Sequence, residues 1–370
     1  MTRAQRLKLI YLVADDRYFC THRLPLAIAA KRQNFDVHVI CPKGDSSEKI
    51  VHAGLTFHPI PFNRKSLNPF DGIKTVWRIF KLYRQIKPDC VHHVAIKPVL
   101  FGTIAGRLAG VPNIINAVAG LGHVFASRSR LIFPLRMLMC VLLRTSCVKI
   151  IVQNPEDQTE LESLAQKPVH LIYGAGVDTE QFTPSVTSLP GSPVVITHAS
   201  RLLWSKGVGE LVSAARVLRK QSHLICVQIV GEPDMQNPDA IPIDTLQAWH
   251  DEGVIKWLGY QSDIAAIYQK SHIAVLASYY REGIPKTLIE AASVGLPIVT
   301  TDMPGCRTIV DHGINGLLVE PRDVVALTEA LARLIRDPEM RRLYGEAGRT
   351  VVLKQFTSTI IYEQTIALYK

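Results

Sequence analysis

The amino-acid sequence alternates short runs of apolar, often β-branched residues with longer stretches of helical periodicity along most of its length. Such alternation predicts parallel sheets with helices on both faces, because parallel strands need long crossover connections. The pattern begins again after residue 190, and 370 residues exceed what one compact core usually holds. The sequence therefore predicts an α/β protein with two doubly wound, Rossmann-like domains.

Seven apolar runs in the first half and six in the second are expected to form the strands. They are residues 7–14, 37–41, 57–60, 89–94, 113–118, 149–153, 169–173, 194–199, 225–230, 255–258, 273–277, 298–301 and 317–319. The Gly- and Pro-rich segment 176–192 is the expected linker between a first domain, 1–175, and a second, 193–352. The helical pattern of 353–370 is expected to pack back toward the first domain. Strands of both domains would end at a cleft, where such folds bind ligands.

The positive charge of the chain is concentrated in its first half. Residues 1–185 hold 24 Lys and Arg against 13 Asp and Glu, whereas residues 186–370 hold 18 against 19. Within residues 60–150, fourteen basic residues face only Asp71 and Asp89. The first domain is therefore expected to face an anionic partner.

One basic segment has an amphipathic pattern. Its cations Lys74, Arg78, Lys81, Arg84 and Lys87 recur at helical spacing, interleaved with the aromatics Trp77, Phe80 and Tyr83. This mixture favours an anionic membrane surface as the partner, since we find no nucleic-acid-binding motif. The alternative is an ordinary solvated helix whose aromatic side chains reach the core.

The membrane association predicted here is peripheral. The most apolar stretch, 131–143, is interrupted by Pro134 and Arg136 and is shorter than the roughly 20 residues of a membrane span. The chain begins without the pattern of a signal peptide, and its seven scattered cysteines form no C-x-x-C pair. We expect a cytoplasmic protein on the inner face of the cytoplasmic membrane.

A candidate anion site follows the first strand of the second domain. Arg201 and Lys206-Gly207 lie between the strand 194–199 and a long helical pattern. A guanidinium fork, an ammonium group and the free N–H groups of a helix start suit a nucleotide diphosphate. The alternative is a solvated loop with incidental charges.

Two glutamates follow the strand 273–277. Pro285 suits a first helical turn, so a helix is expected to start near Lys286. Glu290, one turn inside that helix, is the candidate for binding the hydroxyls of a ribose. Glu282 and the amides of Gly283, Ile284, Pro285 and Lys286 precede the helix, where a sugar hydroxyl or phosphate would bind, although Pro285 itself lacks an N–H. As structural alternatives, Glu282 is a favourable charge at a helix start and Glu290 an ordinary surface residue.

In combination, these residues resemble the diphosphate and E-x7-E motifs of retaining glycosyltransferases of the GT-B fold, family 4. Gly174-Ala-Gly-Val-Asp178 with Phe182, and the segment 313–321, are similar to two further motifs of that family. Phe19-x-x-His22-Arg23, residues 92–98 and Gly120-Leu-Gly122 resemble the branch that builds capsular polysaccharide and O-antigen repeat units. The resemblance covers essentially the whole chain.

The resemblance implies transfer of a sugar from a UDP-sugar to a polyprenyl-diphosphate-linked saccharide, with retention of anomeric configuration. Arg201 and Lys206 would stabilise the departing diphosphate, Glu290 would hold the ribose, and Glu282 would contact the donor sugar. Acceptor binding is expected at His22, Arg23, Lys97, Gly120 and Gly122. Many relatives carry a histidine near the donor sugar, just after the fifth strand. His123 is the candidate for this catalytic position, with packing against Phe125 as the alternative.

No metal or other cofactor is expected, because the chain contains neither a D-x-D pair nor an H-E-x-x-H motif. Two other functions stay open. One is a UDP-sugar epimerase of the same architecture, and the other is a non-catalytic module that binds a sugar nucleotide.

Overall fold

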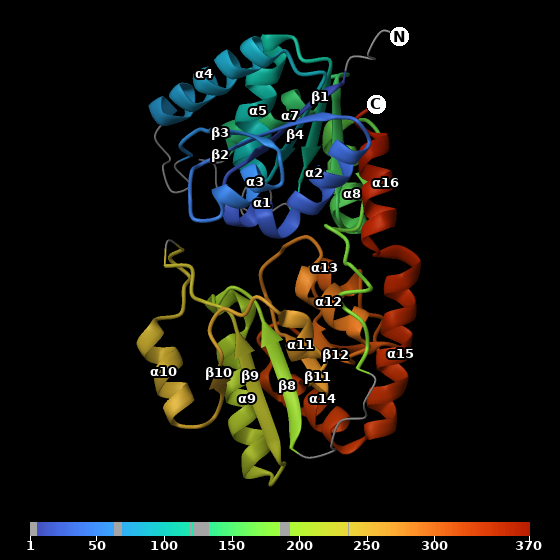
Figure 1. Ribbon diagram of the computed structural model, residues 1–370. Helices are drawn as coiled ribbons and strands as arrows, with labels where there is room; N and C mark the ends of the chain where they lie inside the picture. The colour runs from blue at the N-terminus through green and yellow to red at the C-terminus, as the bar shows by residue number, and fades with distance from the viewer. Residues whose placement is uncertain (1–5, 63–68, 119, 121–132, 186–192, 236) are drawn as a thin grey trace. The chain divides into compact units, whose positions relative to one another are not determined.

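The structure is a computed structural model that describes residues 6–62, 69–118, 120, 133–185, 193–235 and 237–370. The chain divides into two compact units (Figure 1). Unit 1 comprises Met1–Ala175 and Ile361–Lys370, and unit 2 comprises Gly176–Ile360. Each unit contains one parallel sheet, which confirms the predicted fold class of two Rossmann-like domains.

The sheet of unit 1 has the order β3-β2-β1-β4-β5-β6-β7. Its strands are β1 (Lys8–Val13), β2 (Asp36–Cys41), β3 (Thr56–Pro59), β4 (Cys90–Val94), β5 (Asn113–Ala117), β6 (Val148–Val152) and β7 (His170–Leu171). The central strands are buried on both faces, as the continuous apolar runs predict. The strand order reverses between β1 and β4, so loops after these two strands diverge and leave space for a ligand.

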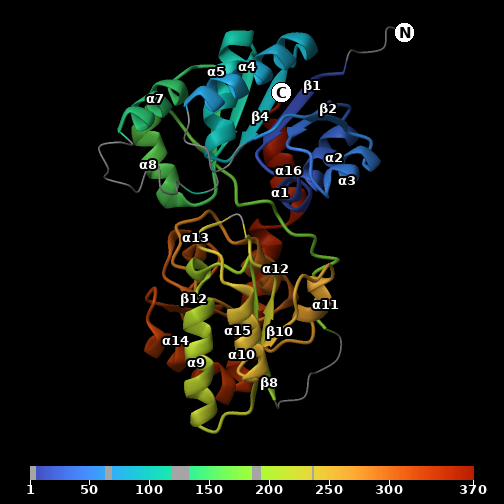
Figure 2. The ribbon, with the colours of Figure 1, turned by 90° about the vertical axis from the view of Figure 1, so that its left-hand side faces the viewer.

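Helices cover both faces of this sheet, as Figure 2 shows. One face packs against α4 (Pro69–Ile86), α5 (Ile96–Ala109), α7 (Phe133–Leu143) and α8 (Pro155–Ala165). The other face packs against α1 (Asp16–His22), α2 (Leu24–Arg32), α3 (Ser47–His52) and α16 (Ser358–Ala367). Within the described ranges, every helix is too short or too polar to span a lipid bilayer.

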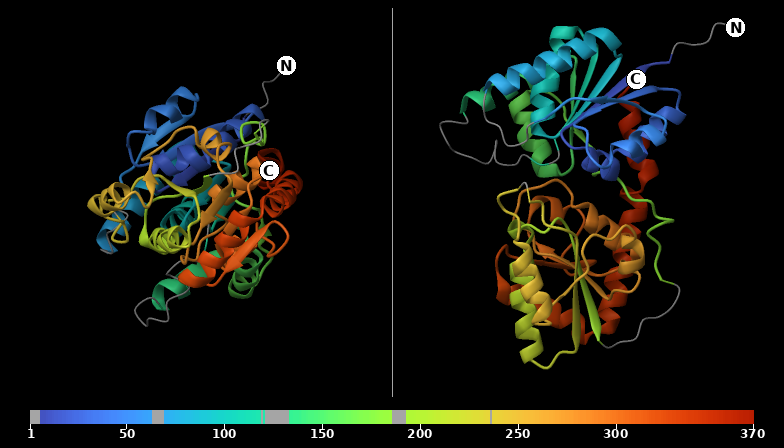
Figure 3. Two further views of the ribbon diagram at one scale, coloured as in Figure 1. Left: turned by 90° about the horizontal axis from the view of Figure 1, so that it is seen from below. Right: turned by 60° about the vertical axis from the view of Figure 1, so that its left-hand side comes forward.

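The sheet of unit 2 has the order β10-β9-β8-β11-β12-β13, with its reversal between β8 and β11. The strands are β8 (Val194–Ala199), β9 (Ile225–Val230), β10 (Lys256–Trp257), β11 (Ile273–Leu276), β12 (Ile298–Thr301) and β13 (Gly316–Val319). The helices are α9 (Val208–Lys220), α10 (Ile243–Asp251), α11 (Ile264–Tyr268), α12 (Lys286–Val294), α13 (Pro304–Arg307), α14 (Val324–Arg336) and α15 (Pro338–Gln355). Figure 3 shows the strands of each unit lying between helices.

Helix α4 has the amphipathic character predicted from its sequence, but only part of its aromatic side chains reach the core. Tyr83 is buried, whereas Trp77 is 55% exposed. The alternative of a helix whose aromatic residues simply pack inward is therefore wrong for Trp77. Lys81 lies 5.3 Å from the centre of the Trp77 ring, so cations and apolar side chains share one exposed face.

The last residues of the chain complete the core of unit 1. The Tyr369 hydroxyl lies 2.8 Å from the Tyr11 hydroxyl on β1 and 2.8 Å from His92 Nδ1 on β4. All three side chains are buried, and burial lowers the pKa of His92 well below its ordinary value. The carbonyl oxygen of Leu368 also accepts hydrogen bonds from Asn113 and Lys149, both at 2.8 Å.

His93, the neighbour of His92 on β4, has a structural role. Its Nδ1 lies 2.8 Å from the side-chain oxygen of Asn116, and its Nε2 lies 3.1 Å from the Tyr83 hydroxyl. Burial lowers the pKa of His93 to about 4, so this imidazole is neutral near pH 7. Both ring nitrogens of His93 are thus satisfied within unit 1.

Replacing Tyr369 with phenylalanine is expected to weaken the centre of unit 1. The change leaves the Tyr11 hydroxyl and His92 Nδ1 without their buried partner, at a cost of about 1 to 3 kcal/mol. Hydrogen exchange of the β1 and β4 amides should accelerate. The control is Tyr344→Phe on α15, whose hydroxyl has no hydrogen-bond partner among the described residues; equal acceleration in both variants would contradict the assignment.

Candidate functional site

The candidate site of unit 2 lies where the order of its strands reverses. β8 and β11 are neighbours in the sheet, and the loops that follow them carry Arg201, Lys206 and Glu282. Carboxyl ends of parallel strands lie at one edge of a sheet, so these loops meet. The topology therefore brings together three of the residues that the sequence analysis selected.

An ion pair joins the two loops. Lys206 Nζ lies 2.5 Å from Glu282 Oε1, although the residues are 76 positions apart in the sequence. The Lys206 side chain is only 9% exposed and that of Glu282 is 24% exposed. No other hydrogen-bond acceptor for Lys206 Nζ occurs in the described part of the chain, so two of its three N–H groups are available to an anion. The alternative of a solvated loop with incidental charges is therefore wrong for Lys206.

Hydrogen bonds from the residues that follow β11 fix the geometry of this pair. The Ser278 hydroxyl lies 3.2 Å both from Glu282 Oε1 and from the carbonyl oxygen of Ser205. The Tyr279 amide donates to the same Ser205 carbonyl at 2.9 Å. The two loops are therefore connected through backbone and side-chain contacts as well as through the charges.

Two glycines allow the loop backbones to approach closely. Gly207 has φ +75°, and a Cβ there would lie 2.0 Å from the Ala277 carbonyl oxygen. A Cβ on Gly305, in α13, would lie 2.0 Å from the carbonyl oxygen of Gly283. Any side chain at either position would push the Lys206 or Glu282 loop away from its neighbour.

Arg201 lies at the exposed side of the site. Its Nη1 is 3.3 Å from Asp234 Oδ2, and its side chain is 57% exposed. Burial raises the pKa of Tyr280, the charge of Glu282 raises it further, and the charge of Arg201 lowers it. Because both charges act on one tyrosine, Arg201 belongs to the same electrostatic environment as the Lys206–Glu282 pair.

The segment before α12 places the remaining donor-site candidates. α12 begins at Lys286, as predicted, with Pro285 as its N-cap and with Gly283 and Ile284 in the preceding loop. Glu290 is buried and accepts from Lys286 Nζ at 3.1 Å. Burial raises the pKa of Glu290, and Lys286 opposes that shift. The alternative of an ordinary surface residue is thus wrong for Glu290.

His198 lies on β8, next to the loop that carries Arg201, and the sequence analysis did not select it. Its Nε2 is 2.8 Å from the Ser200 hydroxyl, which donates to the Arg201 carbonyl oxygen. Burial lowers the pKa of His198 to about 4, and the charge of Lys206 contributes to the shift. This neutral imidazole supports the loop.

Other supporting residues also lack a sequence signal. Ser278 and Gly305 stand at the ends of apolar runs, where small residues are common in any α/β protein. Only the spacing of Pro304-Gly305 after the run 298–301 hinted at a tight turn there.

In unit 1, His22 and Arg23 follow β1, Lys97 follows β4 and Gly120 follows β5. Arg23 is 4% exposed, and its Nε has no hydrogen-bond partner among the described residues. The Nε2 of His92 likewise lacks a partner within the described ranges. Burial is the main cause that lowers the pKa of His92, and the positive charge of Arg23 lowers it further. An unsatisfied buried guanidinium of this kind suits an anionic ligand.

The other unit 1 candidates are less buried or more locally engaged. The His22 ring stacks on Tyr18 at 4.4 Å between centroids, and its Nδ1 lies 3.3 Å from the Tyr18 carbonyl oxygen. Burial lowers the pKa of Lys97. Gly120 has φ +89°, a conformation that favours glycine. Gly122 and His123 lie outside the described residues.

Comparison with family models divides the chain in the same two parts. Residues 180–351 match the model described as "Glycosyl transferases group 1", and residues 8–154 match "Glycosyl transferase 4-like". The candidate donor-site residues fall in the first match, and the described unit 1 candidates fall in the second.

Three curated relatives are similar over most of the chain. The N,N'-diacetylbacillosaminyl-diphospho-undecaprenol alpha-1,3-N-acetylgalactosaminyltransferase of Campylobacter jejuni is 27% identical, covering 94% of both chains. The UDP-Gal:alpha-D-GlcNAc-diphosphoundecaprenol alpha-1,3-galactosyltransferase of Escherichia coli is 25% identical, covering 88% of this chain and 86% of the relative. The N-acetyl-alpha-D-glucosaminyl L-malate synthase of Bacillus anthracis is 31% identical, covering 86% of this chain and 84% of the relative.

A solved structure supports the same fold. The crystal structure of Anabaena HepE in complex with UDP superposes with a TM-score of 0.79 at 19% identity, covering 98% of this chain and 99% of that chain. At this identity the likeness concerns the fold.

Proposed function

Because the chain belongs to the group 1 and 4-like glycosyl transferases and is a glycosyltransferase, we propose that it moves a sugar from a UDP-sugar to a polyprenyl-diphosphate-linked saccharide. The first two relatives are named for diphospho-undecaprenol acceptors, and the second also for a UDP-sugar donor. The third relative is named for L-malate and not for a lipid diphosphate. The acceptor proposed for this chain therefore also rests on residues of unit 1.

The observation that carries the proposal is the Lys206–Glu282 pair at the reversal point of the unit 2 sheet. A buried ammonium with two available N–H groups suits the diphosphate of the donor, and exposed Arg201 supplies a second cation at the same loop. Negative charge grows on that diphosphate as its bond to the sugar breaks, so fixed cations lower the barrier. We infer that these cations replace a metal ion.

The remaining donor contacts follow from the segment that begins with Glu282. The second carboxylate oxygen of Glu282 and the backbone N–H groups of Gly283, Ile284 and Lys286 are the proposed contacts of the transferred sugar and of a phosphate oxygen. Buried Glu290 is the proposed ribose ligand, held in place by Lys286. Its burial means that a ribose hydroxyl would meet a carboxylate with little competition from water.

If transfer occurs in a single step with retention, the acceptor hydroxyl approaches from the side of the departing UDP, and this is the step that we propose. In the proposed step, the acceptor oxygen bonds to the anomeric carbon as the bond from that carbon to the phosphate oxygen breaks. The proton of the acceptor passes to the departing phosphate. No side chain is assigned as a covalent nucleophile, and Arg201 and Lys206 act by stabilising charge.

The acceptor is proposed to bind unit 1. Arg23 is buried, and its Nε has no partner among the residues that the structure describes, so it is the proposed ligand of the lipid diphosphate. His22 at the end of α1 and Lys97 in α5 are the further proposed contacts. Gly120 and Gly122 complete the acceptor set expected from the sequence, and His123 is the proposed catalytic histidine near the donor sugar. A strongly basic unit is consistent with a doubly charged lipid headgroup.

Unit 1 also offers a surface that suits the membrane in which such an acceptor resides. On α4, the apolar side chains of Phe70, Ile73 and Trp77 are 55% to 69% exposed, next to exposed Lys74 and Arg78. Apolar side chains flanked by cations favour the headgroup region of an anionic bilayer. We therefore propose peripheral binding on the cytoplasmic face of the membrane.

A transfer assay tests the proposed function directly. The purified chain is incubated with radiolabelled UDP-sugars and a synthetic polyprenyl-diphosphate sugar, with and without EDTA. A lipid-linked product that forms equally in EDTA is expected. Isomerised UDP-sugar would indicate an epimerase, binding without turnover would indicate a non-catalytic module, and loss of turnover in EDTA would contradict the role of the fixed cations.

Removing either cation should slow transfer more than it weakens binding. Arg201→Ala and Lys206→Ala are each expected to raise the barrier by about 2 to 4 kcal/mol, or about 30- to 1,000-fold in rate. The matched controls are Arg333→Ala and Lys220→Ala, which remove exposed cations of α14 and α9. Rates near wild type in the first two variants would exclude a role in stabilising the leaving group.

The membrane surface can be tested separately. Changing Lys74, Arg78 and Lys81 to glutamine together should weaken binding to phosphatidylglycerol vesicles by about 3 kcal/mol, or roughly 100-fold. UDP affinity should not change. The control changes Arg219, Lys220 and Lys256 of unit 2 to glutamine, which removes the same charge elsewhere; an equal loss would show that net charge alone matters.

A further inference from the structure

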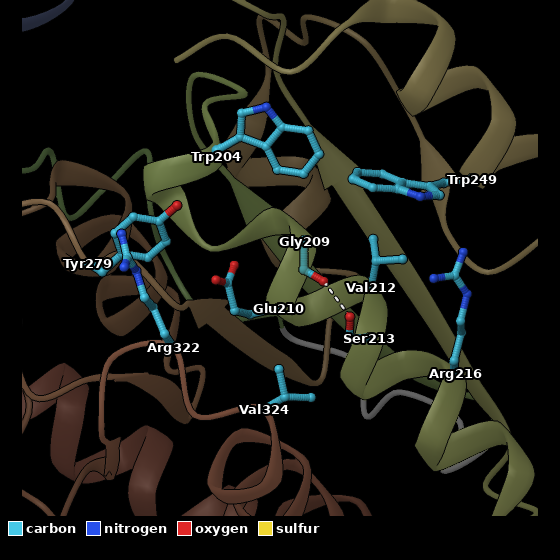
Figure 4. Close-up of a pocket in the computed structure, with 10 residues that line it drawn as sticks. All are labelled: Trp204, Gly209, Glu210, Val212, Ser213, Arg216, Trp249, Tyr279, Arg322 and Val324. Carbon is cyan, nitrogen blue, oxygen red and sulfur yellow. Dashed lines mark hydrogen bonds between the residues drawn. The ribbon is translucent and has the colours of Figure 1, made fainter.

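Unit 2 carries a groove that the proposed transfer reaction does not use. It lies along one side of α9 and has a volume of about 350 Å³ (Figure 4). Its lining comes from five parts of unit 2: Trp204, α9, Trp249 of α10, Tyr279 after β11, and residues 322 and 324 around the start of α14. We propose that this groove binds a sugar unit of a neutral glycan, outside the donor and acceptor sites.

Two indole rings form the apolar part of the groove. The centroids of Trp204 and Trp249 are 5.8 Å apart and their planes meet at 85°, so the rings form a corner. Trp204 is 36% exposed, and a Cβ on Gly209 would lie 3.3 Å from its ring. The absence of a side chain at Gly209 therefore lets the indole lie close to α9. The C–H groups on one face of a pyranose ring pack well on such an aromatic surface.

Polar groups of both signs face the same groove. The Glu210 carboxylate makes no hydrogen bond or ion pair with another residue that the structure describes, and Figure 4 shows it between the two Trp rings and Arg322. The Arg322 guanidinium lies 4.2 Å from the centre of the Tyr279 ring. At the far end, the Nε and Nη2 atoms of Arg216 both donate hydrogen bonds to the carboxylate of Glu252, so these donors are already engaged.

This lining selects the class of ligand. An anion would be repelled by Glu210 and a cation by Arg322, whereas a neutral polyol satisfies both, because its hydroxyls donate to a carboxylate and accept from a guanidinium. The volume lies near the lower end of the range for small-molecule sites, about 300 to 1,000 Å³. A single sugar unit at the end or within a glycan chain fits these requirements best.

The inference does not depend on the proposed transfer reaction, but the two sites are linked through one short turn. Trp204 and Lys206 are the first and last residues of the 3-10 turn before α9. A sugar packed on Trp204 would therefore hold the turn that presents Lys206. The groove could retain a glycan on the enzyme while its donor site is refilled.

The test uses the full chain and three neutral probes, the methyl α-glycosides of glucose, galactose and N-acetylgalactosamine. Binding is followed by saturation-transfer NMR and by tryptophan fluorescence, both without UDP and in the presence of saturating UDP. We expect saturable binding of at least one probe. Glu210→Ala should weaken it about tenfold or more, since a hydrogen bond to a charged group is lost. Trp249→Phe, which keeps an aromatic side chain in the core, should weaken it severalfold.

Two controls make the outcome decisive. Trp77→Ala removes an exposed tryptophan of unit 1 and should leave glycoside binding unchanged. UDP affinity should be the same in all variants, which shows that unit 2 remains folded and that its donor site is intact. The proposal is overturned if no probe binds saturably to the wild type, if neither groove variant weakens binding, or if UDP displaces the glycoside.

Discussion

The site of unit 2 depends on one ion pair between loops that are far apart in the sequence. Lys206 and Glu282 meet because β8 and β11 are neighbours in the sheet and the loops that follow them lie at the same edge. An almost buried ammonium needs a carboxylate nearby, since an isolated charge there would cost several kcal/mol. The same carboxylate leaves two N–H groups of Lys206 available. The pair thus holds the Lys206 ammonium in place before any diphosphate binds.

The backbone around this pair is packed as tightly as its side chains. Gly207 and Gly305 place two peptide carbonyls where a Cβ would otherwise lie, and Ser278 connects both loops by hydrogen bonds. His198 is buried and neutral, and it contacts the Ser200 hydroxyl in the Arg201 loop without adding a charge to the site. The site is therefore held in one arrangement by ion pairing, by hydrogen bonds and by close packing of the backbone. Electrostatic catalysis requires such preorganisation.

Much of the fold could be predicted because the alternation of apolar runs with helical patterns is repeated along the sequence. Every expected strand exists, and the bounds of β8, β9 and β12 match the prediction. The prediction is poorest for β7 and β10, which are two residues long, because an edge strand pairs on one side only and its length depends on its neighbour more than on its own apolar run. Lys206, Glu282 and Glu290 could be selected from the sequence. Their pairing and burial could not, since these depend on residues 76 positions apart and on how α12 packs. The groove beside α9 could not be predicted either, because its lining residues are spread between positions 204 and 324 of the sequence.

The junction at Tyr369 bears on how the protein is made. Its hydroxyl joins β1 to β4, yet it follows all of unit 2 along the chain. The hydrogen bonds of Tyr369 with Tyr11 and His92 can therefore form only after all of unit 2 has been synthesised, although the backbone pairing of β1 with β4 does not need them. A truncation that removes Tyr369 would thus weaken the core of unit 1, although nearly all of that unit lies before unit 2 in the sequence.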